Sequence, residues 1–146
     1  MVDAGSELRR TPWHLWVVGV ISLLWNAFGA YDYTMSKLSP DSYFHEAGLN
    51  DASIAFMKAF PAWLTAFWAL GVWGSLVGSL LLLLRSRHAV TAFALSLLGL
   101  AVSQGYQALA MQAPQPPPMA LMLVIWVSLL LLLYYASAMA RRSVLH

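Results

Sequence analysis

Residues 12–33 read PWHLWVVGVISLLWNAFGAYDY, and the rest of the chain is interpreted from this stretch. It carries no formal charge from Trp13 to Tyr31 and is mostly apolar. A helix needs about 20 such residues to cross a hydrocarbon core about 30 Å thick. Thr11 and Pro12 favour a helix start here, because proline lacks only an N–H that the first turn does not use. The stretch therefore predicts a membrane-spanning helix over residues 12–33.

The composition of the whole chain also indicates a membrane protein. Of its 146 residues, 60% are hydrophobic and 10% are charged, and the mean hydropathy is +0.67. A soluble domain of this length could not bury so much apolar surface. We therefore expect a single integral membrane domain over residues 1–146. The absence of cysteine excludes disulfides, thiolate nucleophiles and Cys-ligated clusters.

Three further apolar stretches have the length of a membrane span. They cover residues of about 59–84, 89–111 and 119–140. The polar segment 34–58 is expected to form an outer loop, in which Asn50 or Asp51 could cap a short interfacial helix. The predicted fold class is therefore all-α, a four-helix transmembrane bundle with an outer loop between its first two helices.

The basic residues predict the orientation of this bundle. Arg and Lys accumulate in the cytoplasmic segments of membrane proteins. With both termini in the cytoplasm, the inner side holds Arg9, Arg10, Arg85, Arg87, Arg141 and Arg142, and the outer side holds only Lys37 and Lys58. We therefore expect a multi-pass protein with both termini inside the cell. Because these cations flank apolar spans and form no continuous basic face, we expect no nucleic acid as a partner.

Small residues recur along the second and third spans. Gly71, Gly74 and Gly78 share a stripe on the second span, and Ser96 and Gly99 share one on the third. Such residues let membrane helices approach closely. The turn between the two spans makes them antiparallel neighbours, and reflection about it places Gly74 level with Gly99. The stripes predict either a seam within this hairpin or a contact between two copies of the chain.

Polar and aromatic residues of the predicted outer half form a candidate ligand site. Counting inward from the outer ends of the spans gives the set Asn26, Asp32, Tyr33, Trp68, Ser103, Gln104, Gln107 and Trp126. Amides, hydroxyls and aromatic rings around an outward cavity would suit an uncharged polar solute or a lipid headgroup. The alternative is hydrogen bonding between helices, which contributes about 0.6–2 kcal/mol per group.

No pattern in the sequence points to catalysis, a metal or a cofactor. Apart from Asp32 at an outer edge, the charged residues lie outside the spans, whereas ion-coupled transporters keep an ionisable group within the membrane. The histidines show no metal-ligand spacing. In the outer loop, Asp41, His45 and Glu46 lack a nucleophile or a second ligand group at useful spacing. We expect a non-enzymatic protein without catalytic residues, metal or cofactor.

Five segments taken together carry a family resemblance. They are PWHLWVVGV, LWNAFGAYDY, FPAW, WALGVWGSLVGSLLLLLRSRHAV, and MARR with VL one residue later. Over nearly its whole length the chain resembles a family of small four-helix proteins of the bacterial inner membrane, some of which are labelled sugar transporters. The resemblance implies a bacterial inner-membrane location and identifies no functional residues.

Together these observations predict an accessory or interaction protein that binds a partner protein or a lipid of the surrounding bilayer. The partner would be another membrane protein or a second copy of the chain. The alternative is an oligomeric transporter of a small uncharged polar solute such as a sugar. In that case Asn26, Gln104 and Asp32 would contact the solute.

Overall fold

The computed structural model describes residues 11–146, which form helices and connections without any strand. The helices are α1 (Trp13–Leu38), α2 (Pro40–Glu46), α3 (Asp51–Lys58), α4 (Ala62–Leu83), α5 (His88–Ala110) and α6 (Met119–Arg141). Of these, α1, α4, α5 and α6 are long and apolar enough to cross a membrane. The predicted all-α fold with four membrane-spanning helices is confirmed.

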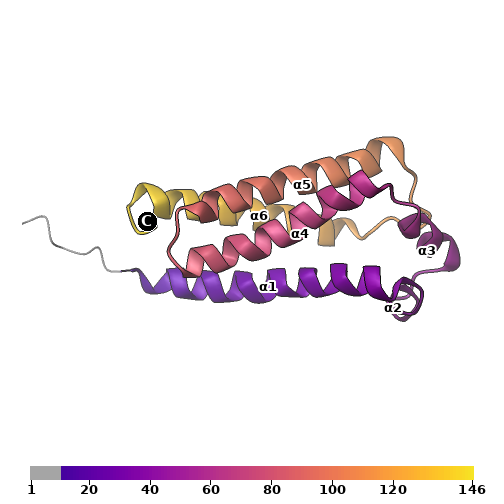
Figure 1. Cartoon of the computed structure of the whole chain (residues 1–146), viewed down its shortest axis with the longest axis horizontal. Coiled ribbons are helices and arrows are strands. Elements are labelled where there is room, and N and C mark those ends of the chain that lie inside the picture. Colours follow the sequence, from indigo (N-terminus) through magenta and orange to yellow (C-terminus); the bar gives the residue numbers. More distant parts are fainter. Residues whose placement is uncertain (1–10) are drawn as a thin grey trace, which may run out of the picture.

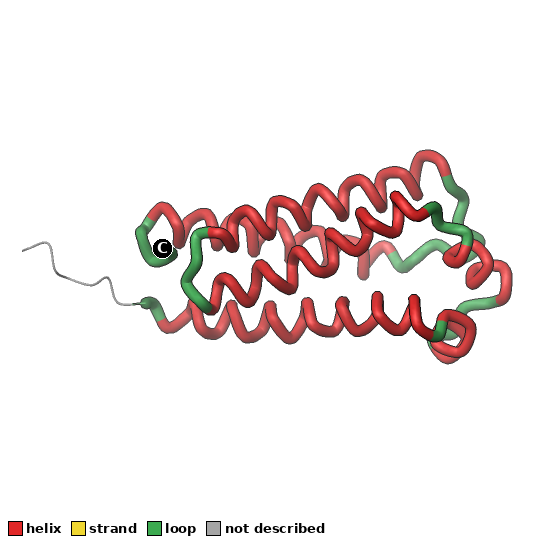
Figure 2. Tube along the Cα trace, in the orientation of Figure 1, coloured by secondary structure: helices red, strands yellow, loops and turns green. Residues whose placement is uncertain are grey.

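The four long helices run along the long axis of the molecule (Figure 1). Helix α4 packs against both α1 and α5, and α6 packs against α5. The connections lie at the two ends (Figure 2). We call one of them the basic end, which holds Arg85, Arg87, Arg141 and Arg142, and the other the loop end, which holds α2, α3 and the connector 111–118.

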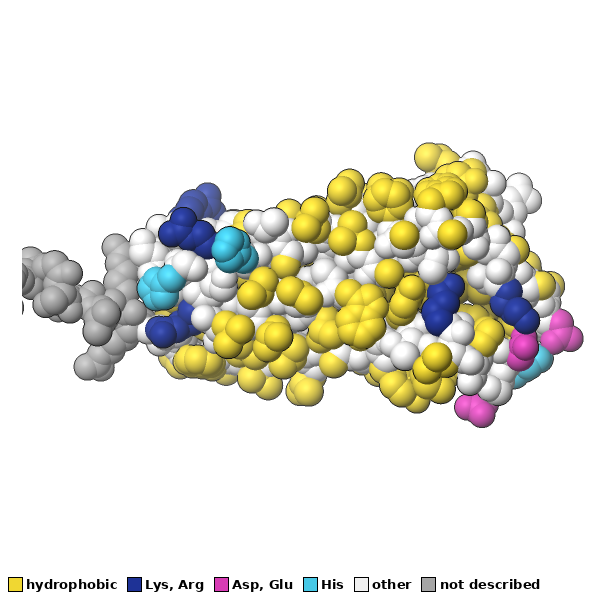
Figure 3. Space-filling model, in the orientation of Figure 1, with side chains coloured by type: hydrophobic (Ala, Val, Ile, Leu, Met, Phe, Trp, Pro, Cys, Tyr) yellow, Lys and Arg dark blue, Asp and Glu magenta, His cyan; other side chains and the backbone are white. Residues whose placement is uncertain are grey.

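Between the two ends the molecule presents an apolar surface. Figure 3 shows hydrophobic side chains over the middle of one face, with acidic side chains gathered at the loop end. Large apolar side chains such as Ile21, Leu24 and Phe28 are more than 60% exposed. Exposed apolar area of this extent is what a helix surface facing lipid requires.

The first helix is longer than the sequence predicted. It continues past residue 33 to Leu38, into the segment expected to be a loop. The hydroxyls of Thr34 and Ser36 donate to carbonyl oxygens one turn earlier in α1, at 2.7 and 2.6 Å. The hydrogen-bonding groups of these side chains are therefore satisfied within the helix, so their polarity in the sequence does not mark the end of α1.

The rest of the expected outer loop is also largely helical. Pro40 opens α2 at a position where its missing N–H costs nothing. Helix α3 matches the predicted short helix, and its cap is Asn50, whose Oδ1 accepts the N–H of Ser53 at 2.9 Å. The segment thus forms two short helices at the loop end, of which the sequence predicted only the second.

Helices α4 and α5 form the closest contact in the bundle. A β-carbon at Gly99 would lie 2.5 Å from both the Gly71 nitrogen and the Phe67 carbonyl oxygen. The Ser96 hydroxyl donates to the Gly71 carbonyl, and the Cα of Gly74 faces Ser96. Gly78 lies against the ring of Phe93. The predicted small-residue stripes therefore face each other within the α4–α5 hairpin.

The pairing within this contact differs from the predicted one by about a helical turn, since Gly99 lies opposite Gly71 and not Gly74. The turn between α4 and α5 begins earlier in the chain than the positions of Arg85 and Arg87 suggest. Arg85 adopts a left-handed φ of 57°, and the N–H of Ser86 returns to the Leu81 carbonyl at 2.8 Å. This closing geometry ends α4 inside the predicted second span.

The basic end is closed by the residues that follow α6. Val144 and Leu145 are 7% and 3% exposed and join the buried cluster that contains Leu15 and Phe93. The N–H of His146 donates to the Arg85 carbonyl at 2.7 Å, and the N–H of Arg87 donates to the His146 carbonyl at 2.9 Å. Segment 143–146 therefore holds the α4–α5 turn.

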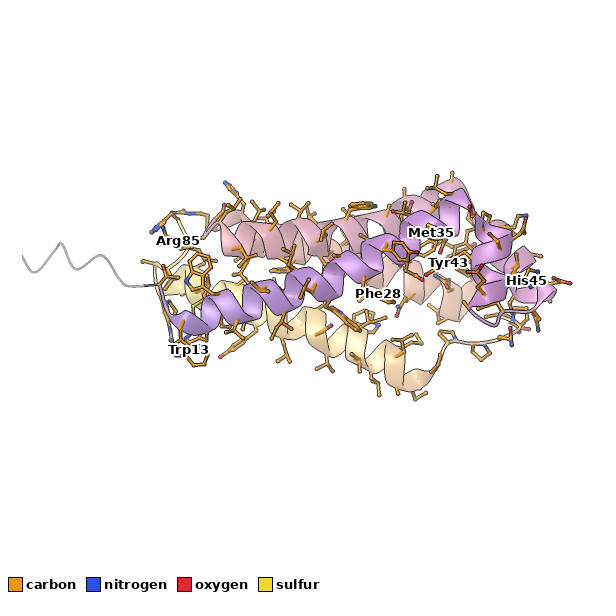
Figure 4. All side chains as sticks on the ribbon, turned by 90° about the horizontal axis from the view of Figure 1, so that it is seen from below. Trp13, Phe28, Met35, Tyr43, His45 and Arg85 are labelled. Carbon is orange, nitrogen blue, oxygen red and sulfur yellow. The ribbon has the colours of Figure 1, made fainter. Side chains whose placement is uncertain are left out.

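Helix α6 is held mainly at the basic end. Its buried residues, Leu129, Leu132, Ala136 and Met139, all lie between its middle and its basic end. There Tyr135 also hydrogen-bonds to His14 of α1. In Figure 4 the ribbon of α6 crosses behind α1, and the two separate towards the loop end from about the level of Phe28. The loop-end half of α6 therefore stands apart from α1.

Candidate functional site

The residues of the predicted ligand site enter several separate contacts between helices. Asn26 lies near the middle of α1, whereas Trp68, Gln104 and Trp126 lie about two turns from the loop end of their helices. The count from residue 33 placed Asn26 too far outward, because α1 continues to Leu38. The predicted layer of equal depth is therefore wrong for Asn26.

Asn26 joins α1 to α4. Its Nδ2 donates to the Ser75 carbonyl oxygen at 3.1 Å and to the Ser79 hydroxyl at 2.8 Å. Asn26 is 8% exposed and Ser79 is fully buried. Both amide hydrogens of Asn26 are thus engaged inside the bundle, where an unpaired polar group would be costly. This arrangement gives Asn26 a role in helix association.

Asp32 joins α1 to α2. The Tyr43 hydroxyl donates to Asp32 Oδ1 at 2.6 Å. This hydrogen bond to the carboxylate, with a smaller contribution from burial, raises the pKa of Tyr43 to about 12. The Asp32 carboxylate therefore anchors the short helix α2 on the end of α1.

An aromatic group connects α1, α4 and the segment before α4. The Trp68 ring meets the Tyr33 ring edge-to-face at 4.9 Å between centroids and the Phe60 ring at 6.3 Å. The Lys37 ammonium lies 5.2 Å from the centroid of Trp68. Trp68 is therefore fixed by neighbouring rings and presents its face to a cation.

Helices α5 and α6 are joined by a second polar contact near the loop end. The Trp126 Nε1–H donates to Gln104 Oε1 at 2.7 Å. Ser103 is buried and donates to the Leu100 carbonyl of its own helix. Within residues 11–146, neither Gln104 Nε2 nor the half-buried amide of Gln107 makes a hydrogen bond. Two amides on α5 thus keep free hydrogen-bonding capacity.

A cavity of about 200 Å³ at the loop end was not predicted from the sequence. It is lined by Lys37, Pro40, Phe44, Met57, Lys58 and Trp68, so Trp68 is its only residue from the predicted site. The cavity forms because α2 packs against both the end of α1 and α3. The only indication of this cavity in the sequence was that Lys37 and Trp68 could meet. That contact could be predicted only if the ends of α1 and α4 were known.

Two exposed pairs of side chains from α2 and α3 lie next to this cavity. His45 Nε2 lies 3.1 Å from Asp51 Oδ1, and Lys58 Nζ lies 3.1 Å from Asp41 Oδ1. Exposed pairs of this kind contribute at most about 1 kcal/mol. Among residues 11–146, no group of three or more His, Asp or Glu side chains is arranged to hold a metal ion.

Comparison with other proteins gives no information about function, so the function is inferred from the geometry described above. No protein-family model, curated protein or solved structure matches the chain. The resemblance to the bacterial inner-membrane family therefore stays a prediction.

Proposed function

We propose that this chain is a non-enzymatic accessory protein of the bacterial inner membrane, with both termini in the cytoplasm, that binds a transmembrane helix of another protein. The observation that carries the proposal is the free hydrogen-bonding capacity of Gln104 and Gln107 beside the loop-end half of α6. The basic end, with its four described arginines, would face the cytoplasm.

The depth of Gln104 in the membrane determines the free-energy cost of leaving its amide without a hydrogen bond. Gln104 lies roughly 9 Å from the loop end of α5, a helix roughly 34 Å long. At that depth the free amide hydrogens face hydrocarbon, where an unsatisfied group costs about 1–3 kcal/mol. An acyl chain offers no acceptor, whereas a neighbouring helix with a hydroxyl, amide or carboxylate side chain does. Interhelical hydrogen bonds of this type stabilise association in membranes.

The surface beside these amides has room for such a helix. No residue of α6 before Leu129 is buried, and Leu123, Val124 and Val127 are each more than 50% exposed. The side chain of Trp126 connects this surface to Gln104 through its hydrogen bond. The loop-end half of α6 and the Gln104 face of α5 together form what we call the α5/α6 surface.

Site-specific cross-linking in native membranes tests the proposal. A photo-reactive amino acid replaces Leu123 on the α5/α6 surface or, as a matched control, Leu80 on α4; these positions are 58% and 48% exposed. We expect a discrete adduct with one other membrane protein from position 123 and none from position 80. Adducts with lipid alone, with a second copy of the chain, or equally from both positions would overturn the proposal.

Two variants then separate the free amide from the internal hydrogen bond. Gln104→Leu removes the donor and is expected to abolish most of the adduct. Trp126→Phe removes the bond to Gln104 Oε1 but keeps the free amide, so the adduct should persist. Loss of the adduct in Trp126→Phe alone would assign the effect to the position of α6 and not to recognition by the amide.

The transporter alternative receives less support from the geometry. Asn26, its central solute contact, already donates both amide hydrogens to α4, and the loop-end cavity does not include it. Solute uptake into proteoliposomes by the intact protein, reduced in Asn26→Ala without loss of the fold, would favour transport over the accessory role.

A further inference from the structure

The loop-end cavity combines two cations with apolar walls. Its walls are the side chains of Pro40, Phe44, Met57 and Trp68, and Lys37 and Lys58 supply its charge. Phe44 is the buried residue of α2 and is 7% exposed. The volume of the cavity, about 200 Å³, is smaller than that of a usual site for a whole drug-sized molecule. The occupant is therefore a small group or the end of a larger one.

The electrostatics of the cavity favour an anion. No acidic side chain lines it, and within residues 11–146 Lys37 forms no ion pair. Lys58 shares its charge with Asp41 outside the cavity. The Ser36 hydroxyl already donates to the Asp32 carbonyl, so it adds no donor. Lys37 is thus the main available donor for an anionic group.

The position of the cavity points to an amphiphilic ligand. Lys37 is the penultimate residue of α1, near the boundary of the predicted membrane, whereas Trp68 lies about two turns into α4, on the hydrocarbon side of that boundary. A freely soluble anion would gain nothing from the apolar walls, whereas a lipid presents a charged group joined to an apolar one at this depth. One face of Trp68 is already occupied by Lys37, and no acidic side chain lines the cavity to pair with a headgroup ammonium.

We propose that this cavity binds the phosphate of an acidic phospholipid whose headgroup carries no compensating ammonium. Lys37 contacts the phosphate, Lys58 approaches it from α3, and the glycerol portion of the lipid lies against Met57 and Trp68. This site is separate from the α5/α6 surface in its residues and ligand, so either proposal can fail without the other.

Native mass spectrometry of the purified full chain measures the proposed binding. The protein is equilibrated with vesicles of equal phosphatidylglycerol and phosphatidylethanolamine content, and the retained lipid is identified. We expect phosphatidylglycerol to be retained preferentially. Lys37→Gln should reduce this retention about fivefold, the effect of one cation near an anionic lipid. Lys37→Arg should preserve it.

A matched control removes a cation from the opposite end of the molecule. Arg87→Gln should leave phosphatidylglycerol retention unchanged, so equal losses in both variants would overturn the proposal. If Lys37→Gln does not fold, as judged by its helical circular dichroism, Lys58→Gln serves instead, with a smaller expected loss because Asp41 already pairs with Lys58. No loss in that variant would also contradict the site.

A final arm distinguishes a lipid from a soluble anion. Inorganic phosphate or glycerol 3-phosphate in excess should not displace the retained phosphatidylglycerol, because neither contacts the apolar walls. Displacement by either soluble anion would overturn the assignment to a membrane lipid and identify a soluble phosphate compound as the ligand.

Discussion

Asn26 is a single amide in an otherwise apolar part of α1, and its partners on α4 account for its presence there. Nδ2 bonds both a backbone carbonyl and the buried Ser79 hydroxyl. We expect Asn26→Leu to lower the free energy of unfolding by about 1–2 kcal/mol, because the α1–α4 hydrogen bonds are lost. Unfolding in a denaturing detergent, followed by circular dichroism, measures the change.

Ser22→Ala is the matched control for this prediction. Ser22 is also buried in α1, but its hydroxyl donates only to the Gly19 carbonyl of the same helix, at 3.1 Å. Its loss should cost clearly less than that of the Asn26 amide. Equal costs for the two variants would show that the bonds to α4 contribute nothing to the bundle.

The Tyr43–Asp32 contact leads to a prediction about how the stability of α2 depends on pH. The pKa of Tyr43 is raised to about 12, so the folded state favours the protonated phenol. The contact should therefore stabilise α2 fully below pH 10, the ordinary pKa of tyrosine, and lose this effect as the pH rises through about 12. Asp32→Asn should bring the pKa of Tyr43 down towards its ordinary value.

An ultraviolet titration of tyrosinate absorbance measures this pKa, with Tyr43→Phe subtracted to isolate the residue. An unchanged titration in Asp32→Asn would mean that the carboxylate does not hold the phenol. The sequence placed Asp32 in the candidate site, but it could not show Tyr43 as its partner, because α2 was not predicted.

At the scale of the helices, the α4–α5 contact depends on the absence of a side chain at Gly99. A β-carbon there meets backbone atoms of Gly71 and Phe67 at 2.5 Å, and backbone cannot move aside as a flexible side chain can. Gly99→Ala should destabilise the protein by about 1–3 kcal/mol. Thermal unfolding in detergent measures the effect.

Gly105→Ala is the control on the same helix. A β-carbon at Gly105 meets nothing within 4 Å, so the higher helix propensity of alanine should leave stability unchanged or raise it by up to about 1 kcal/mol. If Gly99→Ala is equally harmless, α4 and α5 are not packed as closely as described.

The elements also show where sequence reasoning succeeds and where it stops. Long uncharged stretches, bounded by charges or by the proline-rich connector 112–118, identify the four spanning helices, because bilayer thickness imposes their length. The end of α1 was missed because the hydroxyls of Thr34 and Ser36 are satisfied inside the helix. That error displaced Asn26 in the depth count. The lysine-lined cavity depends on how α2 folds against α1 and α3, which no local pattern encodes.

At the scale of the whole molecule, the proposed topology makes the two ends face different compartments. Reporter domains inserted in the connector 111–118 and in the turn 84–87 should report opposite sides of the membrane, with the turn in the cytoplasm. Alkaline phosphatase and a fluorescent protein that folds only in the cytoplasm are suitable reporters. The same compartment for both insertions would contradict a four-span topology.

The contact between segment 143–146 and the α4–α5 turn has a consequence for the order of assembly during synthesis. The α4–α5 hairpin can form as soon as both helices have left the ribosome, because its contacts are local in the chain. Val144 and Leu145 join the cluster that contains Leu15 only after α6 has been inserted. Until then one end of the nascent protein exposes an incomplete apolar cluster, and the insertion of α6 is the step that completes it.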